Sequence, residues 1–114
     1  MPDCIFCKII AGTIPSTKVE ESANVYAFRD IQPQAPTHVL LIPKKHLVAS
    51  AADIGSEHGA VLAEIFALAA RVARNERLQG GWRLVTNVGP DAGQSVLHLH
   101  FHLLGGRAMQ WPPG

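Results

Sequence analysis

Only one segment of this chain has the apolar periodicity of a long helix, and this constrains its fold more than any other feature. The segment runs from about Ser56 to Arg77, and Gly80-Gly81 supplies a stop. Its apolar stripe consists of Val61, Leu62, Ile65, Phe66, Leu68, Ala69 and Val72. Because repeated βαβ units need a helix for each crossover, we expect an α+β domain with an antiparallel sheet instead. The stripe would then form core or a subunit contact.

Four other segments have the composition of β-strands. They are residues 25–29, 38–42, 82–87 and 97–104. The second of them is apolar at nearly every position, so we expect it to be buried on both faces of the sheet. Pro33 and Pro36 predict a connecting loop before it.

Composition limits the classes of function. We interpret residues 1–114 as one domain, long enough for a hydrophobic core, with 47% apolar and 17% charged residues. A net charge of +1 gives no electrostatic basis for binding nucleic acid or an anionic membrane. No run approaches the roughly 20 apolar residues of a membrane span. The first residues lack the features of a signal peptide, and we expect a cytoplasmic location.

The last predicted strand carries three histidines at every second position, His98, His100 and His102. Side chains of a strand alternate between faces, so the three imidazoles should share one face. A half-buried strand whose histidines have no chemical role is the simpler alternative. One zinc ion shared by all three is unfavourable, because residues i and i+4 lie roughly 13 Å apart at Cα. We therefore expect His100 to be the reacting group, with its neighbours orienting it or the substrate.

An imidazole can act as a nucleophile, and attack at phosphorus suits it because water can resolve the phosphoryl-imidazole. The phosphate oxygens then need hydrogen-bond donors where charge develops. Gly89 and Gly93, just before the histidines, let backbone N–H groups approach a phosphate, and Ser95 adds a hydroxyl. Such glycine loops are common, so it is their position beside the histidines that favours a phosphate site.

The run from Gly93 to Leu104 resembles the motif of the histidine triad (HIT) family at every position. Residues 28–38, 42–46 and 104–114 are similar to the Hint branch of that family, the purine nucleoside phosphoramidases. The resemblance covers nearly the whole chain. It implies a HIT-like fold, with an antiparallel sheet of about five strands, one long helix and a short N-terminal helical segment.

The resemblance also implies a role for each matched residue. His100 would attack the α-phosphorus of a nucleoside 5′-phosphoramidate, release the amine and leave a nucleotidyl-histidine for water to hydrolyse. His102 would contact the phosphate, His38 would bond into the triad, and Ser95 would assist departure of the amine, with no cofactor required. The implied nucleotide-binding set is Phe28, Asp30, Ile31, Asn87, Gly93, Gln94, Ser95, His100 and His102.

Several of these residues have simpler interpretations when taken alone. A carboxylate such as Asp30 can accept from both hydroxyls of a ribose, but Asp30 also precedes a proline-containing turn. Phe28 and Ile31 would be core residues, Asn87 a turn residue at a strand end, and His38 a core histidine. The joint pattern, and not any single residue, favours the site.

Both cysteines of the chain fall in one pair, Cys4 and Cys7. Two thiolates at this spacing are half of a structural zinc site, and His46 and His98 are candidates for the other half. The resemblance implies the same set, because many bacterial HIT proteins bind zinc through two cysteines at this spacing and two such histidines. A zinc ion on His98 would stiffen the strand that carries His100. The alternative is a pair of reduced, buried cysteines.

The resemblance implies a homodimer whose C-terminal tail lies near the partner's site, with a purine nucleoside monophosphate or phosphoramidate as ligand. Gln110 stands where Hint relatives often carry histidine, which leaves the preferred leaving group open. Two alternatives remain. One is a nucleotide-binding or scaffold protein with vestigial hydrolysis. The other is a dinucleoside polyphosphate hydrolase, although that branch typically has glutamine where this chain has His102.

Overall fold

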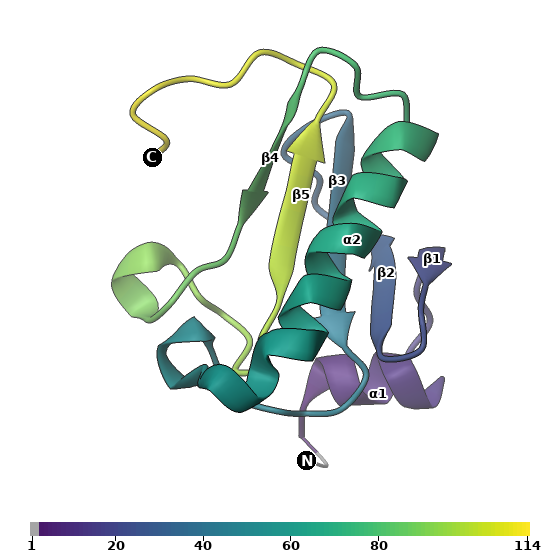
Figure 1. The fold of residues 1–114 in the computed structure, drawn as a ribbon, viewed down its shortest axis with the longest axis vertical. Helices are drawn as coiled ribbons and strands as arrows, with labels where there is room; N and C mark the ends of the chain where they lie inside the picture. The colour runs from purple at the N-terminus through teal and green to yellow at the C-terminus, as the bar shows by residue number, and fades with distance from the viewer. Residues whose placement is uncertain (1–2) are drawn as a thin grey trace.

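The computed structural model describes residues 3–114, and its centre is a five-stranded antiparallel sheet with a helix on each face (Figure 1). The strands lie in the order β1-β2-β3-β5-β4. They are β1 (Lys18–Glu21), β2 (Val25–Arg29), β3 (Thr37–Pro43), β4 (Trp82–Val85) and β5 (Phe101–Gly105). The helices are α1 (Ile5–Ala11) and α2 (Gly59–Asn75). The expected α+β class, five-stranded sheet, long helix and short N-terminal helix are confirmed. Within residues 3–114 neither helix is long and apolar enough to cross a membrane.

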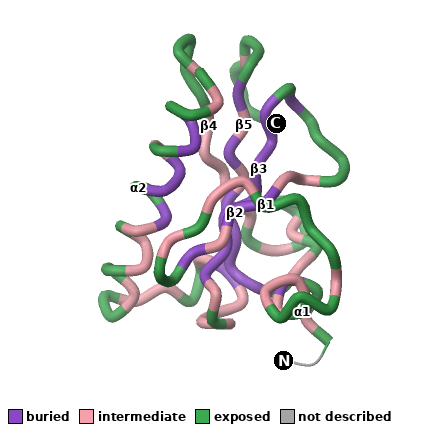
Figure 2. Tube along the Cα trace, turned by 90° about the vertical axis from the view of Figure 1, so that its right-hand side faces the viewer, coloured by how far each residue is buried: buried purple, intermediate pink, exposed green. Residues whose placement is uncertain are grey.

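The strand β3 lies at the centre of the sheet, and all seven of its residues are buried, as its apolar sequence predicts. Alternate side chains pack on opposite faces. Val39 and Leu41 join the core under α2, whereas Leu40 and Ile42 join Phe6 of α1 on the other face. Figure 2 shows α2 and α1 on the two sides of the buried strands. The sheet therefore has a larger apolar core under α2 and a smaller cluster around Phe6 of α1 on its other face.

The helix α2 buries its apolar stripe but ends earlier than expected. Its buried residues are Ile65, Leu68, Ala69, Val72 and Ala73. The expectation that Gly80-Gly81 ends the helix is wrong, because α2 ends at Asn75 and Arg77 adopts a left-handed φ of 60°. Glu76 turns out of the helix to pair with Arg29 of β2, and Leu78 packs against the core. The helix end is closed locally, because the N–H of Leu78 donates to the carbonyl of Ala73 around the left-handed Arg77, and the long-range contacts accompany this cap.

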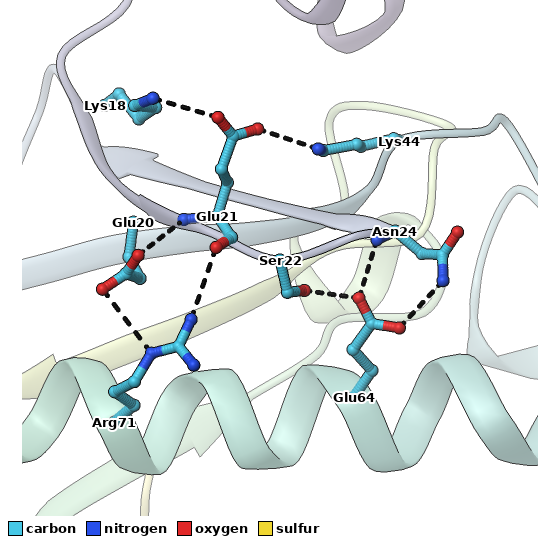
Figure 3. A network of polar contacts seen from close by, with 8 residues as sticks. All are labelled: Lys18, Glu20, Glu21, Ser22, Asn24, Lys44, Glu64 and Arg71. Atoms are coloured by element: carbon cyan, nitrogen blue, oxygen red, sulfur yellow. Dashed lines mark hydrogen bonds and ion pairs between the residues drawn. The ribbon is translucent and has the colours of Figure 1, made fainter.

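Polar contacts fasten the turn between β1 and β2 to α2 (Figure 3). Glu64 of α2 accepts hydrogen bonds from the hydroxyl of Ser22, from the backbone N–H of Asn24 at 2.7 Å and from its side-chain amide at 3.0 Å. These hydrogen bonds hold the pKa of Glu64 below its usual value. Arg71, two turns along the helix, donates to the carbonyl of Glu21 at 3.3 Å. The turn is thus held at two points along the helix.

The strand that carries the histidines is shorter than expected, because β5 begins only at Phe101. Just before it, the N–H of Leu99 donates to the carbonyl of Val48 at 3.0 Å and not to a neighbouring strand. The predicted strand 82–87 likewise ends at Val85, which pairs with His102. Leu99 and Phe101 still belong to the core under α2, so the alternation of faces survives where the strand pairing does not.

Candidate functional site

Three imidazoles meet on the α1 side of the sheet. His38 lies on β3, His102 lies on β5, and His100 lies just before β5. The ring centroids of His38 and His102 are 5.2 Å apart, and those of His100 and His102 are 5.1 Å apart. The Phe6 ring from α1 packs on His100 in a T-shaped arrangement, with centroids 5.0 Å apart. Sheet and helix thus enclose the histidines between them.

The ring of His100 is fixed by its own backbone neighbourhood. Its Nδ1 lies 2.7 Å from the carbonyl oxygen of His98, and a carbonyl can only accept, so Nδ1 carries the proton. The lone pair of a neutral His100 is therefore on Nε2. His100 lies just before β5, and the hydroxyl of Thr86 donates to its carbonyl at 2.7 Å. Sequence reasoning missed Thr86, because a threonine inside the predicted strand 82–87 gives no specific signal.

A second chain of hydrogen bonds fixes His102. The backbone N–H of Gln34 donates to Nδ1 of His38 at 3.0 Å, so the proton of a neutral His38 is on Nε2. That Nε2 lies 2.9 Å from Nδ1 of His102 and donates to it. His102 then keeps its own proton on Nε2, where it is a hydrogen-bond donor. His100 and His102 thus have opposite tautomers, one suited to attack and the other to donation.

Asp30 completes the group but does not turn it into a metal site. One carboxylate oxygen of Asp30 lies 3.4 Å from Nε2 of His38, and the other accepts from the N–H of Gln32 at 2.7 Å. Asp30, His38 and His102 have the composition of a metal-binding triad. A metal would need the lone pair of His38 on Nε2, which the donor N–H of Gln34 disfavours. The group is therefore a hydrogen-bond relay, in which Asp30 also makes the turn that its position predicted.

Burial keeps the imidazoles of His38, His100 and His102, called the triad below, neutral near pH 7. Desolvation lowers the pKa values of His38 and His100, although Asp30 opposes the shift in both. Desolvation, with smaller contributions from His100 and His38, lowers the pKa of His102 to about 4. A neutral His100 keeps its nucleophilic lone pair, and a neutral His102 donates without carrying charge.

A cleft of about 150 Å³ lies beside these residues, between α1 and the end of β2. Among the residues that line it are Ile5, Phe6, Ile9, Phe28, Asp30 and Ile31. The structure thus brings together the three residues that were expected around a nucleoside. Ile31 is not a core residue, since it is 94% exposed at the rim. Sequence reasoning missed the contribution of α1, although the apolar spacing of Ile5, Phe6 and Ile9 is the signal that could have found it.

The loop before β5 is braced by Gln94. Its side-chain oxygen accepts from the N–H of Gly89 at 2.9 Å, and its amide donates to the carbonyls of Ala49 at 2.8 Å and Val96 at 3.1 Å. The side chain is therefore engaged within the protein. Gly93 takes a left-handed φ of 85° at the turn. A contact of either residue with a nucleotide stays a prediction.

Ser95 and Asn87 are less closely placed. Ser95 is exposed and lines a cavity of about 310 Å³ together with Cys4, Ile5 and His46. Asn87 is half-buried in the segment that follows β4. Among residues 3–114, no hydrogen bond joins either side chain to an imidazole of the triad. Their expected roles remain predictions.

A separate cluster brings Cys4, Cys7, His46 and His98 together, as their sequence positions suggested. Their ligand atoms all lie within 4.8 Å of one another. Nδ1 of His98 is 3.3 Å from Sγ of Cys4 and 3.7 Å from Sγ of Cys7, which is 3.5 Å from Nδ1 of His46. Sulfur and nitrogen ligands of a tetrahedral zinc ion lie about 3.5 Å apart. The spacing and the donor set both fit zinc.

The ring of His98 is oriented for such a site. Its Nε2 lies 3.0 Å from the carbonyl of Pro43, so Nε2 carries the proton and Nδ1 presents its lone pair to the cysteines. Cys4 precedes α1, and its sulfur accepts from the N–H of Cys7 at 3.4 Å. Burial is the main cause that raises the pKa of the Cys7 thiol. A bound cation would offset that effect by favouring the thiolate.

Comparison with known proteins identifies the family. The HIT domain family matches residues 11–109. The chain belongs to the HIT family. A solved HIT family hydrolase from Legionella pneumophila Philadelphia 1 is 53% identical, with a TM-score of 0.94 over 98% of this chain and 100% of that one. The HIT-like fold and the likeness to hydrolases of this family are thereby shown.

Two curated HIT relatives carry informative names. A "14 kDa zinc-binding protein" of Zea mays is 52% identical over 96% of this chain and 87% of its own length. "Adenylylsulfatase HINT1" of Arabidopsis thaliana is 49% identical over 96% of this chain and 76% of its own length. Cys4 and Cys7 precede the residues that the HIT domain matches, so the metal cluster combines residues from within and outside the matched region.

Proposed function

We propose that this HIT protein is a nucleoside 5′-phosphoramidate hydrolase that acts through a covalent nucleotidyl-His100 intermediate. The observation that carries the proposal is the pair of opposite tautomers, with a free Nε2 lone pair on His100 and an Nε2–H donor on neighbouring His102. Attack at the α-phosphorus needs a nucleophile with an available lone pair and a hydrogen-bond donor for the phosphate oxygens.

In the first step, Nε2 of His100 attacks the α-phosphorus, and the bond from phosphorus to the amine nitrogen breaks. The developing charge on the phosphate oxygens is stabilised by His102 Nε2–H, whereas the N–H groups of Gly89, Gly93 and Gln94 are already bonded within their own loop. The leaving amine takes up a proton that the exposed hydroxyl of Ser95 relays from solvent, so that Ser95 stays neutral. In the second step, water attacks phosphorus, the bond from phosphorus to Nε2 of His100 breaks, and the water gives up a proton to solvent, which leaves the nucleoside monophosphate and neutral His100.

The nucleoside is proposed to occupy the cleft beside α1. Phe28 and Ile31 supply apolar contacts for a purine base, and the carboxylate of Asp30 accepts hydrogen bonds from the ribose hydroxyls. A dinucleoside polyphosphate would fit the same chemistry at phosphorus. The presence of His102, and the Hint-like sequence of the tail, favour the phosphoramidate.

A second candidate substrate is adenylyl sulfate, which the printed name of the Arabidopsis thaliana relative suggests. Attack at the same α-phosphorus would then release sulfate. Sulfate can leave as an anion without taking up a proton, whereas an amine must be protonated as it leaves. Dependence on a proton donor such as Ser95 therefore separates the two substrates.

Turnover of an adenosine 5′-phosphoramidate by the purified protein and by its His100→Ala variant tests this function. We expect hydrolysis by the native chain and a loss of at least about 10³-fold in the variant, as for removal of other enzymatic nucleophiles. Equal rates would refute the mechanism. Absence of turnover by the native chain would instead favour a nucleotide-binding protein, and faster turnover of adenylyl sulfate or a dinucleoside polyphosphate would reassign the substrate.

We also propose a structural zinc ion held by Cys4, Cys7, His46 and His98. The name of the Zea mays relative supports this metal, as does the spacing of the donor atoms. The ion would supply a fixed anchor for His98, whose carbonyl in turn orients the ring of His100. Its role is support of the site and not catalysis.

A homodimer is the proposed assembly. The edge strand β4 exposes Trp82 by 41%, and α2 exposes Phe66 by 55%, so apolar side chains are exposed at and near an edge of the sheet. We expect a solution mass twice that of the 12.3 kDa chain. Phe66→Lys should lower that mass towards one chain, whereas Ile31→Lys, which changes an exposed residue at the cleft, should not. A monomeric native protein in sedimentation would contradict the assembly.

A further inference from the structure

We propose that Arg107 is a positioning residue for the triad, which holds the loop before β3 so that His38 keeps His102 in a single tautomer. Arg107 lies in the tail that follows β5 and is exposed. The consequence for catalysis rests on the proposed hydrolysis. The positioning itself rests only on the contacts described below.

The guanidinium of Arg107 is directed at one residue of that loop. Its Nε and Nη2 both donate to the carbonyl oxygen of Gln34, at 3.2 and 3.0 Å, and Nη1 donates to the carbonyl of Ala108 at 3.0 Å. Among residues 3–114 no carboxylate pairs with this guanidinium. The N–H groups of the guanidinium therefore bind backbone carbonyls, through charge-assisted hydrogen bonds.

The backbone is shaped to bring Arg107 to this position. Gly106 has a left-handed φ of 92°, and a Cβ built there would lie 2.9 Å from Cβ of Pro36. A glycine is thus needed both for the conformation and for the close approach of tail and loop. The neighbouring residues Thr37 and Gly105 pair in the sheet. The tail therefore turns directly onto the loop where β3 begins.

Gln34 links this contact to the triad. The residue that accepts from Arg107 through its carbonyl also donates through its N–H to Nδ1 of His38. That N–H is the group that places the proton of His38 on Nε2, facing His102. At the other end of the loop, Asp30 holds the N–H of Gln32. The loop is thus attached at two points, at Gln32 by Asp30 and at the carbonyl of Gln34 by Arg107. Gln34 is the residue whose N–H sets the tautomer of His38.

Release of Gln34 would remove the constraint on both rings. If its N–H moves away, Nδ1 of His38 can hold the proton, and the bond between His38 and His102 can form only with the roles reversed. His102 would then donate from Nδ1 and lose the Nε2–H that faces the substrate in the proposed reaction. Binding of a nucleotide in the cleft would not depend on this change, whereas stabilisation of the transition state would.

Long-range ¹H–¹⁵N correlation spectra of the histidine rings test the inference directly in the ligand-free protein. In the native chain we expect His38 and His102 to show single, fixed tautomers with protonated Nε2. In Arg107→Ala we expect both to shift towards averaged tautomers, and Arg107→Lys should restore much of the native pattern. Unchanged ring spectra in Arg107→Ala would overturn the proposal.

Arg83→Ala is the matched control, because Arg83 also donates to a tail carbonyl, that of Gln110, at 3.0 Å. It should leave the His38 and His102 signals as in the native protein. Equal changes in the two alanine variants would overturn the proposal, since they would mean that anchoring of the tail in general is what matters.

Kinetics extend the test to the proposed reaction. Arg107→Ala should lower kcat for the phosphoramidate about tenfold, the worth of one charge-assisted hydrogen bond. The dissociation constant for adenosine monophosphate should change by less than about twofold, since Arg107 binds no part of the ligand. A loss confined to binding would contradict the positioning role. Failure of the native chain to hydrolyse the phosphoramidate would refute the proposed function, while the ring spectra would still decide the role of Arg107.

Discussion

The three alternating histidines differ at the level of single atoms, although they look equivalent in the sequence. Nε2 of His98 donates to the carbonyl of Pro43, and Nδ1 of His100 donates to the carbonyl of His98. Nδ1 of His102 accepts from Nε2 of His38. Spacing predicted that they share a face, but it could not predict these partners. Two of the partners, Pro43 and His38, lie more than fifty residues away in the chain, whereas the partner of His100 is the carbonyl of nearby His98.

Acid should destabilise the fold through His102. Its pKa is about 4 in the folded protein, against about 6.5 in an unfolded chain, so the unfolded state binds more protons between these values. The free energy of unfolding should therefore be constant above about pH 7 and fall as the pH drops from there towards 4. The lowered pKa of His38 acts in the same direction.

Urea denaturation between pH 4.5 and 7.5 measures this dependence. We expect the His102→Gln variant to show a shallower decrease than the native protein over the same range. Identical slopes for the two proteins would show that His102 is not held neutral by the fold.

At the scale of elements, the segment between β4 and β5 positions the nucleophile, although within residues 3–114 none of its residues pairs in the sheet. Gln94 supplies three hydrogen bonds to this segment and to Ala49, and Thr86 holds the backbone at His100. Side chains thus replace the ladder that ends at Val85 and His102. The position of the nucleophile depends on them.

Gln94→Ala should loosen this segment without unfolding the sheet. Loss of the three bonds should lower the free energy of unfolding by about 1–3 kcal/mol, as for other partly buried hydrogen bonds. Amide exchange should accelerate at residues 89–96 more than in β3. Gln79→Ala, a change at an exposed glutamine, is the control and should alter neither. Unchanged exchange in Gln94→Ala would show that the side chain does not brace the loop.

The sequence was a good guide to the elements whose signal is local. The strand β2 has the predicted limits, and β3 is buried on both faces as its apolar residues required. The strand β1 was not located, since Lys18-Val19-Glu20-Glu21 has little apolar alternation and depends on its pairing with β2. Likewise, the early start expected for β5 failed because Leu99 bonds to Val48. For the site, the residues that meet were largely predictable, but the lining contributed by α1 and the brace from Gln94 were not.

For the molecule as a whole, the sheet divides labour between its two faces. The face under α2 is the larger apolar core, and the face under α1 carries the triad, the cleft and the metal cluster. The cluster also joins the N-terminal segment to the residues just before β5. A metal ion there would tie together parts of the chain more than ninety residues apart.

Removal of zinc should therefore destabilise the whole protein. We expect one zinc ion per chain after purification and a lower melting temperature once a chelator has removed it, because binding to the folded state alone adds stability. Cys7→Ser should lose the ion, whereas His58→Ala, which alters a histidine outside the cluster, should retain it. A native protein that neither binds zinc nor responds to the chelator would leave the cysteines as a reduced apolar pair.

Capture of the intermediate tests the central claim most directly. The protein is mixed rapidly with an adenosine 5′-phosphoramidate and quenched at alkaline pH, where a phosphoryl-imidazole survives, and the adduct is mapped by mass spectrometry. We expect an adenylyl group on His100 that forms and decays within turnover and is absent from His100→Ala. Turnover without any protein-bound adenylyl group, or an adduct on another residue, would contradict the account.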